Sequence, residues 1–283
     1  MPTGTTSSVR AVIDDATGRL KRAGVETPRL DTELLLAHVL ETTRPNLLAG
    51  LAAALTAEQT VNFEQLIARR GQREPVAYIT GAKGFRRIDL QVDSRVLIPR
   101  SETELLVAVV KVGRPCGILD VGTGSGAVAL ALADELPDAT IQAVDVSENA
   151  LTVARGNAER LGVAGRVSFS QSDLLASVAG AFDAIAANLP YVASAEMTAL
   201  QPEITRYEPE LALDGGPDGL DLVRKLAGQA PSRLKPGGLL ALEIGDDQGA
   251  ATKEILNQCG FVQTEIHLDL SGRDRVVSGT TPA

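Results

Sequence analysis

The 283-residue sequence contains no tryptophan and only two cysteines and two histidines, and these shortages exclude several kinds of site. Cys116 and Cys259 are too far apart for a metal-binding motif, and a reducing compartment is the simplest interpretation. His38 and His267 lie in different halves of the chain, which argues against a catalytic triad or a zinc site. The sequence therefore predicts no metal.

Long apolar runs and a surplus of basic residues are also missing. No run is long enough to span a bilayer, and the polar N-terminus lacks a signal-peptide core, so we expect a cytoplasmic protein without a membrane partner. The net charge of -9 argues against a broad surface for nucleic acid, and no direct nucleic-acid partner is expected. The apolar content of 44% is typical of a globular protein, and the length indicates about two domains.

The N-terminal part shows apolar residues at helical spacing. A first helix is expected to end at Gly24, a second to begin around Pro28 and a third after Thr56, a suitable N-cap. Residues 1–73 are thus predicted to form a helical bundle domain. In residues 74–100, apolar residues and glycines alternate in a way that predicts a connector with a short β-hairpin.

From residue 101 onwards the sequence begins with a helix over 101–111, and strands then alternate with helices. Strands are expected near 117–121, 140–144, 166–170, 182–187, 238–244, 262–267 and 274–279, and helices near 125–135, 147–161, 217–230 and 247–258. This order is typical of a doubly wound α/β fold. The last two strands are too close in sequence for a parallel crossover and must form an antiparallel hairpin. Residues 101–283 are therefore predicted to form a sheet of six parallel strands and one antiparallel strand.

A glycine-rich loop follows the first strand of this domain and precedes a helix. Its residues are Gly122, Thr123, Gly124, Ser125 and Gly126. Glycines permit a sharp turn and close approach to a ligand. The spacing is one residue tighter than the dinucleotide fingerprint, which disfavours a nicotinamide dehydrogenase and resembles S-adenosylmethionine-dependent methyltransferases.

Two acidic residues follow the next strands. Asp145 ends the second strand, where a carboxylate can accept hydrogen bonds from both hydroxyls of a ribose. Asp173 follows the third and is expected to meet the adenine edge. Each alone is also compatible with a turn or a helix cap. As an ordered set with the glycine loop, they favour a cofactor site.

Asn188, Leu189, Pro190 and Tyr191 follow the fourth strand of this domain. Ligands bind at the carboxyl ends of strands in open α/β sheets, and these residues can grip a flat, polar, uncharged group. Asn and Pro are also common turn residues, so the tetrapeptide alone is compatible with a plain turn.

Nearly the whole chain resembles the peptide chain release factor glutamine methyltransferases, the HemK/PrmC family. The resemblance is carried by the glycine loop, Asp145 and the following motifs: Arg73-Glu74-Pro75-Val76-Ala77-Tyr78-Ile79, Leu97-Ile98-Pro99-Arg100, Glu208-Pro209, Asp218-Gly219-Leu220, Glu243-Ile244-Gly245 and Gly272-Arg273-Asp274-Arg275. It implies a seven-stranded Rossmann-like methyltransferase, preceded by a domain that recognises the substrate.

The resemblance also implies an activity and its residues. The family transfers a methyl group from S-adenosylmethionine, leaving S-adenosylhomocysteine, to the side-chain amide of the glutamine in the Gly-Gly-Gln motif of release factors. Gly122 to Gly126, Asp145, Leu174 and Asn188 would contact the cofactor, and residues 188–191 the glutamine. Leu189 and Ser101 stand where the family has proline. We expect Leu189 to be harmless, because the family uses a backbone carbonyl at this position.

Two other functions fit parts of this pattern. Asn-Leu-Pro-Tyr also resembles the motif of ribosomal RNA adenine dimethylases, but an adenine methyltransferase acting on RNA or DNA should have a basic face and aromatic residues. The chain is acidic and only 3% aromatic. A non-catalytic binding module with the same fold is the other alternative, and cofactor titration would discriminate it.

Overall fold

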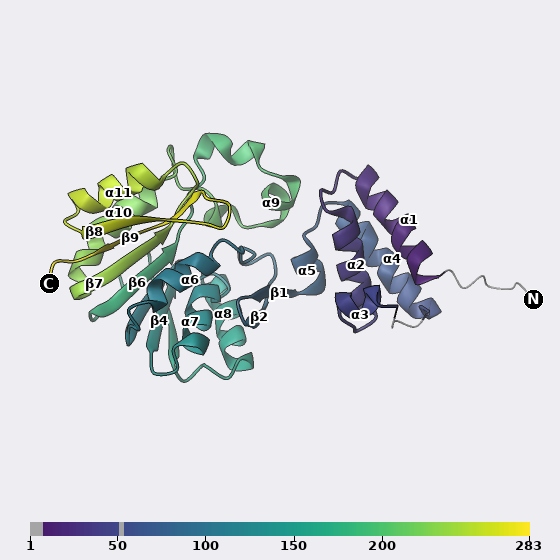
Figure 1. The fold of residues 1–283 in the computed structure, drawn as a ribbon, viewed down its shortest axis with the longest axis horizontal. Helices are drawn as coiled ribbons and strands as arrows, with labels where there is room; N and C mark the ends of the chain where they lie inside the picture. The colour runs from purple at the N-terminus through teal and green to yellow at the C-terminus, as the bar shows by residue number, and fades with distance from the viewer. Residues whose placement is uncertain (1–7, 51–53) are drawn as a thin grey trace, which may run out of the picture. The chain divides into compact units, whose positions relative to one another are not determined.

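The computed structural model describes residues 8–50 and 54–283, which form two compact units (Figure 1). The first unit contains the chain up to Gly81 together with Gln201–Tyr207. The second contains Ala82–Leu200 and Glu208–Ala283. The segment expected as a connector, residues 74–100, is therefore divided between the two units at Gly81.

The first unit is helical, as the apolar spacing predicts. Its helices are α1 (Val9–Arg22), α2 (Pro28–Val39), α3 (Arg44–Leu48), α4 (Ala57–Gly71), α5 (Val76–Thr80) and α9 (Pro202–Tyr207). Thr56 caps α4 in a capping box with Gln59, which confirms the predicted N-cap. The core of this unit includes the fully buried side chains of Leu35, Phe63 and Ile67. Burial of such side chains is the main source of stability of a small bundle.

Helix α9 comes from a distant part of the sequence and is held in this unit by ion pairs. Glu203 accepts hydrogen bonds from Arg70 at 2.8 Å and from Arg73 at 2.6 Å. Arg70 is itself buried and also donates to Asp31 at 2.7 Å. Tyr207 Oη donates to the carbonyl of Gln72 at 3.0 Å. Buried charges need such partners, because an unpaired charge in the interior is costly.

The predicted hairpin is only partly correct. Val76–Thr80, which was expected to be part of it, is the helix α5, because Pro75 precedes it in an extended conformation and Gly81 ends it in a left-handed one. The hairpin itself is formed by β1 (Ala82–Phe85) and β2 (Ile88–Gln91). The buried Asn157 fastens it to the second unit through two hydrogen bonds with the backbone of Gln91.

The described part of the second unit contains one seven-stranded sheet in the order β5-β4-β3-β6-β7-β9-β8. Its strands are β3 (Gly117–Val121), β4 (Thr140–Asp145), β5 (Val167–Gln171), β6 (Phe182–Asn188), β7 (Leu234–Glu243), β8 (Val262–Leu268) and β9 (Asp274–Thr280). Within this sheet β9 alone runs opposite to the other six strands. The predicted sheet of six parallel strands and one antiparallel strand is thus confirmed.

Helices cover both faces of this sheet (Figure 1). They are α6 (Glu104–Lys111), α7 (Ala127–Glu135) and α8 (Glu148–Arg160), which pack in a row, and α10 (Asp221–Gln229) and α11 (Gly249–Gln258), which pack together. Short 3-10 turns lie at Ser194–Ala199, Glu210–Ala212 and Ala230–Ser232.

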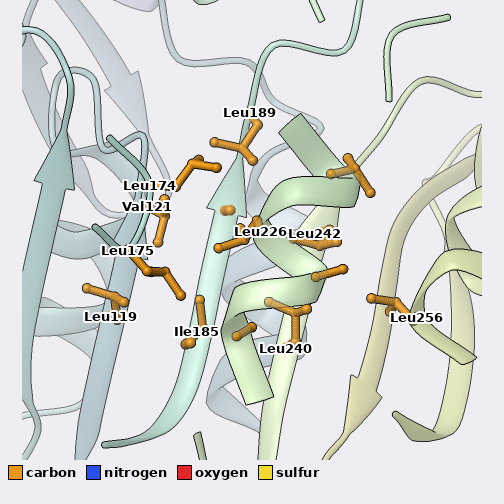
Figure 2. Close-up of a cluster of buried hydrophobic side chains, with 14 of the residues drawn as sticks. Leu119, Val121, Leu174, Leu175, Ile185, Leu189, Leu226, Leu240, Leu242 and Leu256 are labelled. Atoms are coloured by element: carbon orange, nitrogen blue, oxygen red, sulfur yellow. The ribbon is translucent and has the colours of Figure 1, made fainter. Parts of the chain in front are cut away.

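The core between α10 and the sheet is made of aliphatic side chains, most often leucine (Figure 2), together with Phe182 and Phe261. Leu226 of α10 packs there with Ile185 of β6 and Leu240 of β7, and all three are fully buried. Leu189, just beyond the end of β6, lies at the upper end of the same cluster (Figure 2). The core thus reaches the edge where the strands end and holds the backbone of that edge in place.

Candidate active site

A cavity of about 300 Å³ opens at the carboxyl ends of β3, β4 and β6. Most of the residues singled out in the sequence line it: Gly122, Thr123, Gly124, Ser125, Asp145, Asp173, Leu174, Asn188, Leu189 and Pro190. The two other residues singled out in the sequence, Gly126 and Tyr191, do not line the cavity. The cavity is at the lower end of the size range of small-molecule sites and has a largely apolar wall with a few polar groups.

The glycine loop turns sharply from β3 into α7. The N–H groups of Gly122 and Thr123 donate to the Val144 carbonyl of β4 at 2.8 and 3.0 Å. Gly126 has a left-handed φ of 85°, and a Cβ there would lie 2.8 Å from Leu130. Gly124 also has a positive φ, but no heavy atom lies within 4 Å of the place of its Cβ. Gly126 is therefore needed for packing, whereas Gly124 leaves open space beside the cavity.

Asp120 holds this loop from below, although nothing in the sequence singled it out. Its carboxylate accepts hydrogen bonds from the Thr123 hydroxyl at 2.6 Å and from the Ala129 N–H at 3.1 Å. Complete burial raises the pKa of Asp120 to about 6, and the two hydrogen bonds act in the opposite direction. The loop is thus fixed before any ligand binds.

Asp145 lies at the end of β4, facing the glycine loop. Its oxygens accept hydrogen bonds from the N–H groups of Gly124 and Ser147, both at 2.9 Å. Burial raises the pKa of this carboxyl above its ordinary value. Further along the rim, Asp173 is exposed, and Leu174 has a left-handed φ of 48°, which is strained for a leucine. Carboxylates so placed can accept hydrogen bonds from the hydroxyl and amino groups of a nucleoside.

Asn188 ends β6, and its carboxamide has a defined orientation. Asn188 Nδ2 donates to Thr103 Oγ1 at 3.1 Å, so Oδ1 is the part of the carboxamide that remains for a ligand. Thr103 precedes α6 and also lines the cavity. Sequence reasoning missed Thr103, because its partner is 85 residues away in the chain.

The Leu189 side chain has a structural function that was not foreseen. It is only 5% exposed and packs in the core cluster, with its Cδ2 3.1 Å from where a Cβ of Gly122 would lie. Leu189, which differs from the family motif, therefore connects two loops: the glycine loop and the loop that follows β6 from Leu189 onward, called the β6 loop below. Any residue supplies the carbonyl at this position, but the side chain is not free to vary.

The chain after Pro190 is held by a second network. Gln248 Nε2 donates to the Tyr191 carbonyl at 2.9 Å, and the Gly245 N–H donates to Gln248 Oε1 at the same distance. Gly219 has a φ of 75°, and a Cβ there would lie 2.2 Å from Tyr191 O. The motif Asp218-Gly219-Leu220 therefore requires its glycine because the β6 loop packs directly against it.

One wall of the cavity is fixed by Glu208. Its buried carboxylate accepts hydrogen bonds from Arg100 Nη2 at 2.6 Å and from the Ile98 N–H at 3.3 Å. The cavity is lined by Pro99 and Arg100 and by Pro209, the residue after Glu208. The motif segments around residues 97–100 and 208–209 thus meet in space.

The described part of the chain has neither a metal-binding cluster nor a membrane-spanning helix. Residues 8–50 and 54–283 contain no group of three or more His, Cys, Asp or Glu side chains that is arranged to hold a metal ion. In the same residues, none of the helices has both the length and the apolar composition that crossing a bilayer requires.

Solved structures of methyltransferases share the fold of this chain. A methyltransferase from Pyrococcus furiosus covers 76% of this chain and 99% of its own with a TM-score of 0.54 at 20% identity. The hMettl16 catalytic domain covers 69% and 76% with a TM-score of 0.56 at 14% identity. A glycine loop and strand-end carboxylates around a largely apolar cavity fit S-adenosylmethionine. This shared fold and the match of the methyltransferase small domain model to residues 100–216 define an S-adenosylmethionine-dependent methyltransferase with a Rossmann-like sheet.

Relatives narrow this class further. The release factor glutamine methyltransferase of Moorella thermoacetica is 47% identical over 95% of this chain and 96% of its own length, and that of Rhodospirillum rubrum is 45% identical over 93% and 82%. The chain belongs to the release factor glutamine methyltransferase family. Two family models also match this chain: the PrmC N-terminal domain over residues 11–81 and the methyltransferase small domain over residues 100–216.

Proposed function

We propose that this protein transfers a methyl group from S-adenosylmethionine to the side-chain amide nitrogen of the glutamine in the Gly-Gly-Gln motif of peptide chain release factors. One observation carries the proposal most directly. Asn188, Leu189 and Pro190 line the same cavity as the glycine loop and Asp145, so a flat amide and a nucleoside cofactor can meet there. The names of the relatives supply the substrate class.

The cofactor is assigned to the part of the cavity nearer β3 and β4. Gly122–Gly126 would allow close approach of its amino-acid end, Asp145 would bind the ribose hydroxyls, and Asp173 and Leu174 would border the adenine. When bound, S-adenosylmethionine supplies a methyl group that its sulfonium already activates. Each Asp145 oxygen accepts one backbone hydrogen bond and has a second lone pair for a ribose hydroxyl. Burial raises the pKa of this carboxyl.

Asn188 and Leu189 are assigned to the substrate amide. An amide nitrogen is a poor nucleophile, because its lone pair is delocalised into the carbonyl. We assign Asn188 Oδ1 and the Leu189 carbonyl as acceptors for the two amide hydrogens, which would align the nitrogen with the methyl group. Alignment of this kind can contribute up to about 7–11 kcal/mol in the best intramolecular reactions. The bond from Asn188 Nδ2 to Thr103 supports this assignment, since it leaves Oδ1 for the substrate.

Pro190 and Tyr191 are assigned a supporting function. Pro190 would stiffen the loop and hold Leu189 extended, which fixes the direction of the Leu189 carbonyl. Tyr191 would pack against the amide plane. Its side chain is half-buried outside the cavity wall in this structure, so this contact requires the substrate to extend beyond the cavity. No separate base is assigned, because the amide becomes acidic once methylated and can release its proton late.

The helical domain, residues 1–73, is proposed to recognise the release factor, and residues 101–283 to carry the chemistry. The partner is a protein, and the acidic chain gives no reason to propose direct nucleic-acid binding. Since release factors act on ribosomes, the proposed place of action is the cytoplasm.

Incubation with labelled S-adenosylmethionine and purified release factors tests this function. Label is expected on the wild-type release factor and not on one whose Gly-Gly-Gln glutamine is replaced by alanine. Label on the alanine variant, or on RNA or DNA oligonucleotides instead, would contradict the assigned substrate.

Two further measurements test the site and the class of protein. Asn188→Ala is expected to lose methyl transfer while calorimetry still detects cofactor binding. The absence of binding at millimolar cofactor would favour a non-catalytic module.

A further inference from the structure

Glu243 is a buried carboxyl group beside the active site that the proposed reaction does not use. It ends β7 and is the register partner of Asn188 on β6. Its side chain is 2% exposed, and among the described residues neither carboxyl oxygen has a hydrogen-bond partner of ordinary geometry. An unpartnered carboxyl in the interior is costly and calls for an explanation.

The surroundings of Glu243 are polar and charged although they exclude water. Arg275 of β9, Arg100 and Glu102 before α6, and Tyr191 all interact with its charge. Burial raises the pKa of Glu243 to about 7, while Thr103 and then the two arginines act to lower it. The group can therefore change its charge near neutral pH.

Thr103 connects Glu243 to the proposed amide clamp, which consists of Asn188 Oδ1 and the Leu189 carbonyl. The Thr103 hydroxyl accepts the hydrogen bond from Asn188 Nδ2 and has one hydrogen left to donate. Thr103 is near enough to Glu243 to lower the pKa of that carboxyl, and no hydrogen bond of ordinary geometry joins the two groups in this structure. A hydrogen bond from the Thr103 hydroxyl would satisfy the unpartnered Glu243 carboxylate.

We propose that Glu243 is a positioning residue: its carboxylate accepts the Thr103 hydroxyl hydrogen, which keeps Thr103 Oγ1 an acceptor for Asn188 Nδ2 and turns Asn188 Oδ1 toward the substrate amide. The inference rests on the proposed function of Asn188. Glu243 does not line the cavity and acts only through Thr103. With a proton on Glu243, the Thr103 hydroxyl is released to donate to the Asn188 carboxamide, which then turns its Nδ2 toward the amide and repels it.

Kinetics across pH 6 to 9 test this relay. In the wild-type enzyme kcat is expected to fall below about pH 7, with the KM for the cofactor unchanged. Thr103→Val should lower kcat at pH 8 at least tenfold, the value of about one hydrogen bond, and remove the pH dependence below 7. Thr103→Ser keeps the hydroxyl. Its kcat at pH 8 should stay within about threefold of wild type, and kcat should still fall below pH 7. Glu243→Gln should keep much of kcat but lose the pH dependence.

Thr252→Val is the matched control, because Thr252 is also buried and its hydroxyl has no partner among the described residues. It should leave kcat and its pH profile unchanged. A Thr103→Val enzyme that behaves like Thr252→Val overturns the relay. The same holds for a Glu243→Gln enzyme that keeps the wild-type pH profile.

A spectroscopic measurement separates the relay from the proposed activity. In the 15N-labelled full-length protein, the Asn188 side-chain amide resonances, assigned with Asn188→Ala, should shift with a midpoint near pH 7. Thr103→Val and Glu243→Gln should abolish this shift. Resonances that titrate in a protein that methylates no release factor would uphold the relay and refute the proposed substrate. Resonances of an active enzyme that ignore both pH and Glu243→Gln would refute the relay alone.

Discussion

Leu189→Ala separates the two functions of the residue between Asn188 and Pro190. The carbonyl is assigned to the substrate, whereas the side chain is 5% exposed and packs in the core. Truncating a buried leucine to alanine costs about 2–5 kcal/mol. Leu189 borders the cavity and loses packing partners mainly on one side, so we expect a loss of about 2–3 kcal/mol, in the lower half of that range.

The activity of this variant should suffer much less than its stability. Pro190 still holds residue 189 extended, so the carbonyl keeps its direction, and kcat at a temperature where the variant is folded should stay within about threefold of wild type. Urea unfolding and single-turnover methyl transfer measure the two quantities. Leu226→Ala is the control, since Leu226 is fully buried in the same cluster but does not line the cavity.

Two outcomes would refute this reasoning. A hundredfold fall in kcat with intact folding and cofactor affinity would mean that the Leu189 side chain, and not its carbonyl, serves the chemistry. An unchanged free energy of unfolding, while Leu226→Ala loses several kcal/mol, would mean that the packing of Leu189 adds nothing.

Three further changes test other parts of the site and fold. Gly219→Ala should destabilise the protein by more than about 1 kcal/mol in urea unfolding and lower activity, because its Cβ would meet the Tyr191 carbonyl. Asp145→Asn should weaken cofactor binding about tenfold in calorimetry, since a charged acceptor becomes neutral; equal affinity would contradict the ribose assignment. Arg86 lowers the pKa of Glu135 from 4.5 to about 2, so this carboxylate stabilises the fold above pH 4.5 and its contribution disappears as pH falls toward 2. Glu135→Gln should therefore cost up to about 3 kcal/mol at pH 7 and nothing near pH 2, and a pH-independent cost would refute the ion pair as its cause.

Much of the second unit could be predicted from the sequence, because buried parallel strands are apolar runs that end in recognisable turns. The predicted strand at 182–187 is observed as Phe182–Asn188, and the short link before Asp274 correctly required an antiparallel pair. Helix α10 begins at Asp221 rather than near 217, because Gly219 adopts a left-handed turn just before it. Between Pro75 and Gly81, five residues were too few for periodicity to separate a helix from a strand.

The residues that line the cavity were predictable for a different reason. In an α/β sheet, the ends of strands converge at one edge, so residues after each strand could be placed together without knowing any contact. The residues that hold these lining residues in place could not be predicted from the sequence. Gln248 and Tyr191 are 57 residues apart, and no local pattern distinguishes Gln248 from any other polar residue before a helix. Such pairs are decided by tertiary packing alone.

The β6 loop shows why the difference from the family motif is tolerable. A proline at position 189 would fix the backbone by its own ring, whereas Leu189 is fixed from outside, by Pro190 after it and by the core beneath it. The same backbone direction is thus obtained from packing instead of covalent restraint. The cost is dependence on neighbours: Gly122, against which Leu189 Cδ2 lies, must remain without a side chain for the loop to close. The glycine loop and the β6 loop are therefore packed as one unit, and a side chain added at Gly122 should displace Leu189 as well.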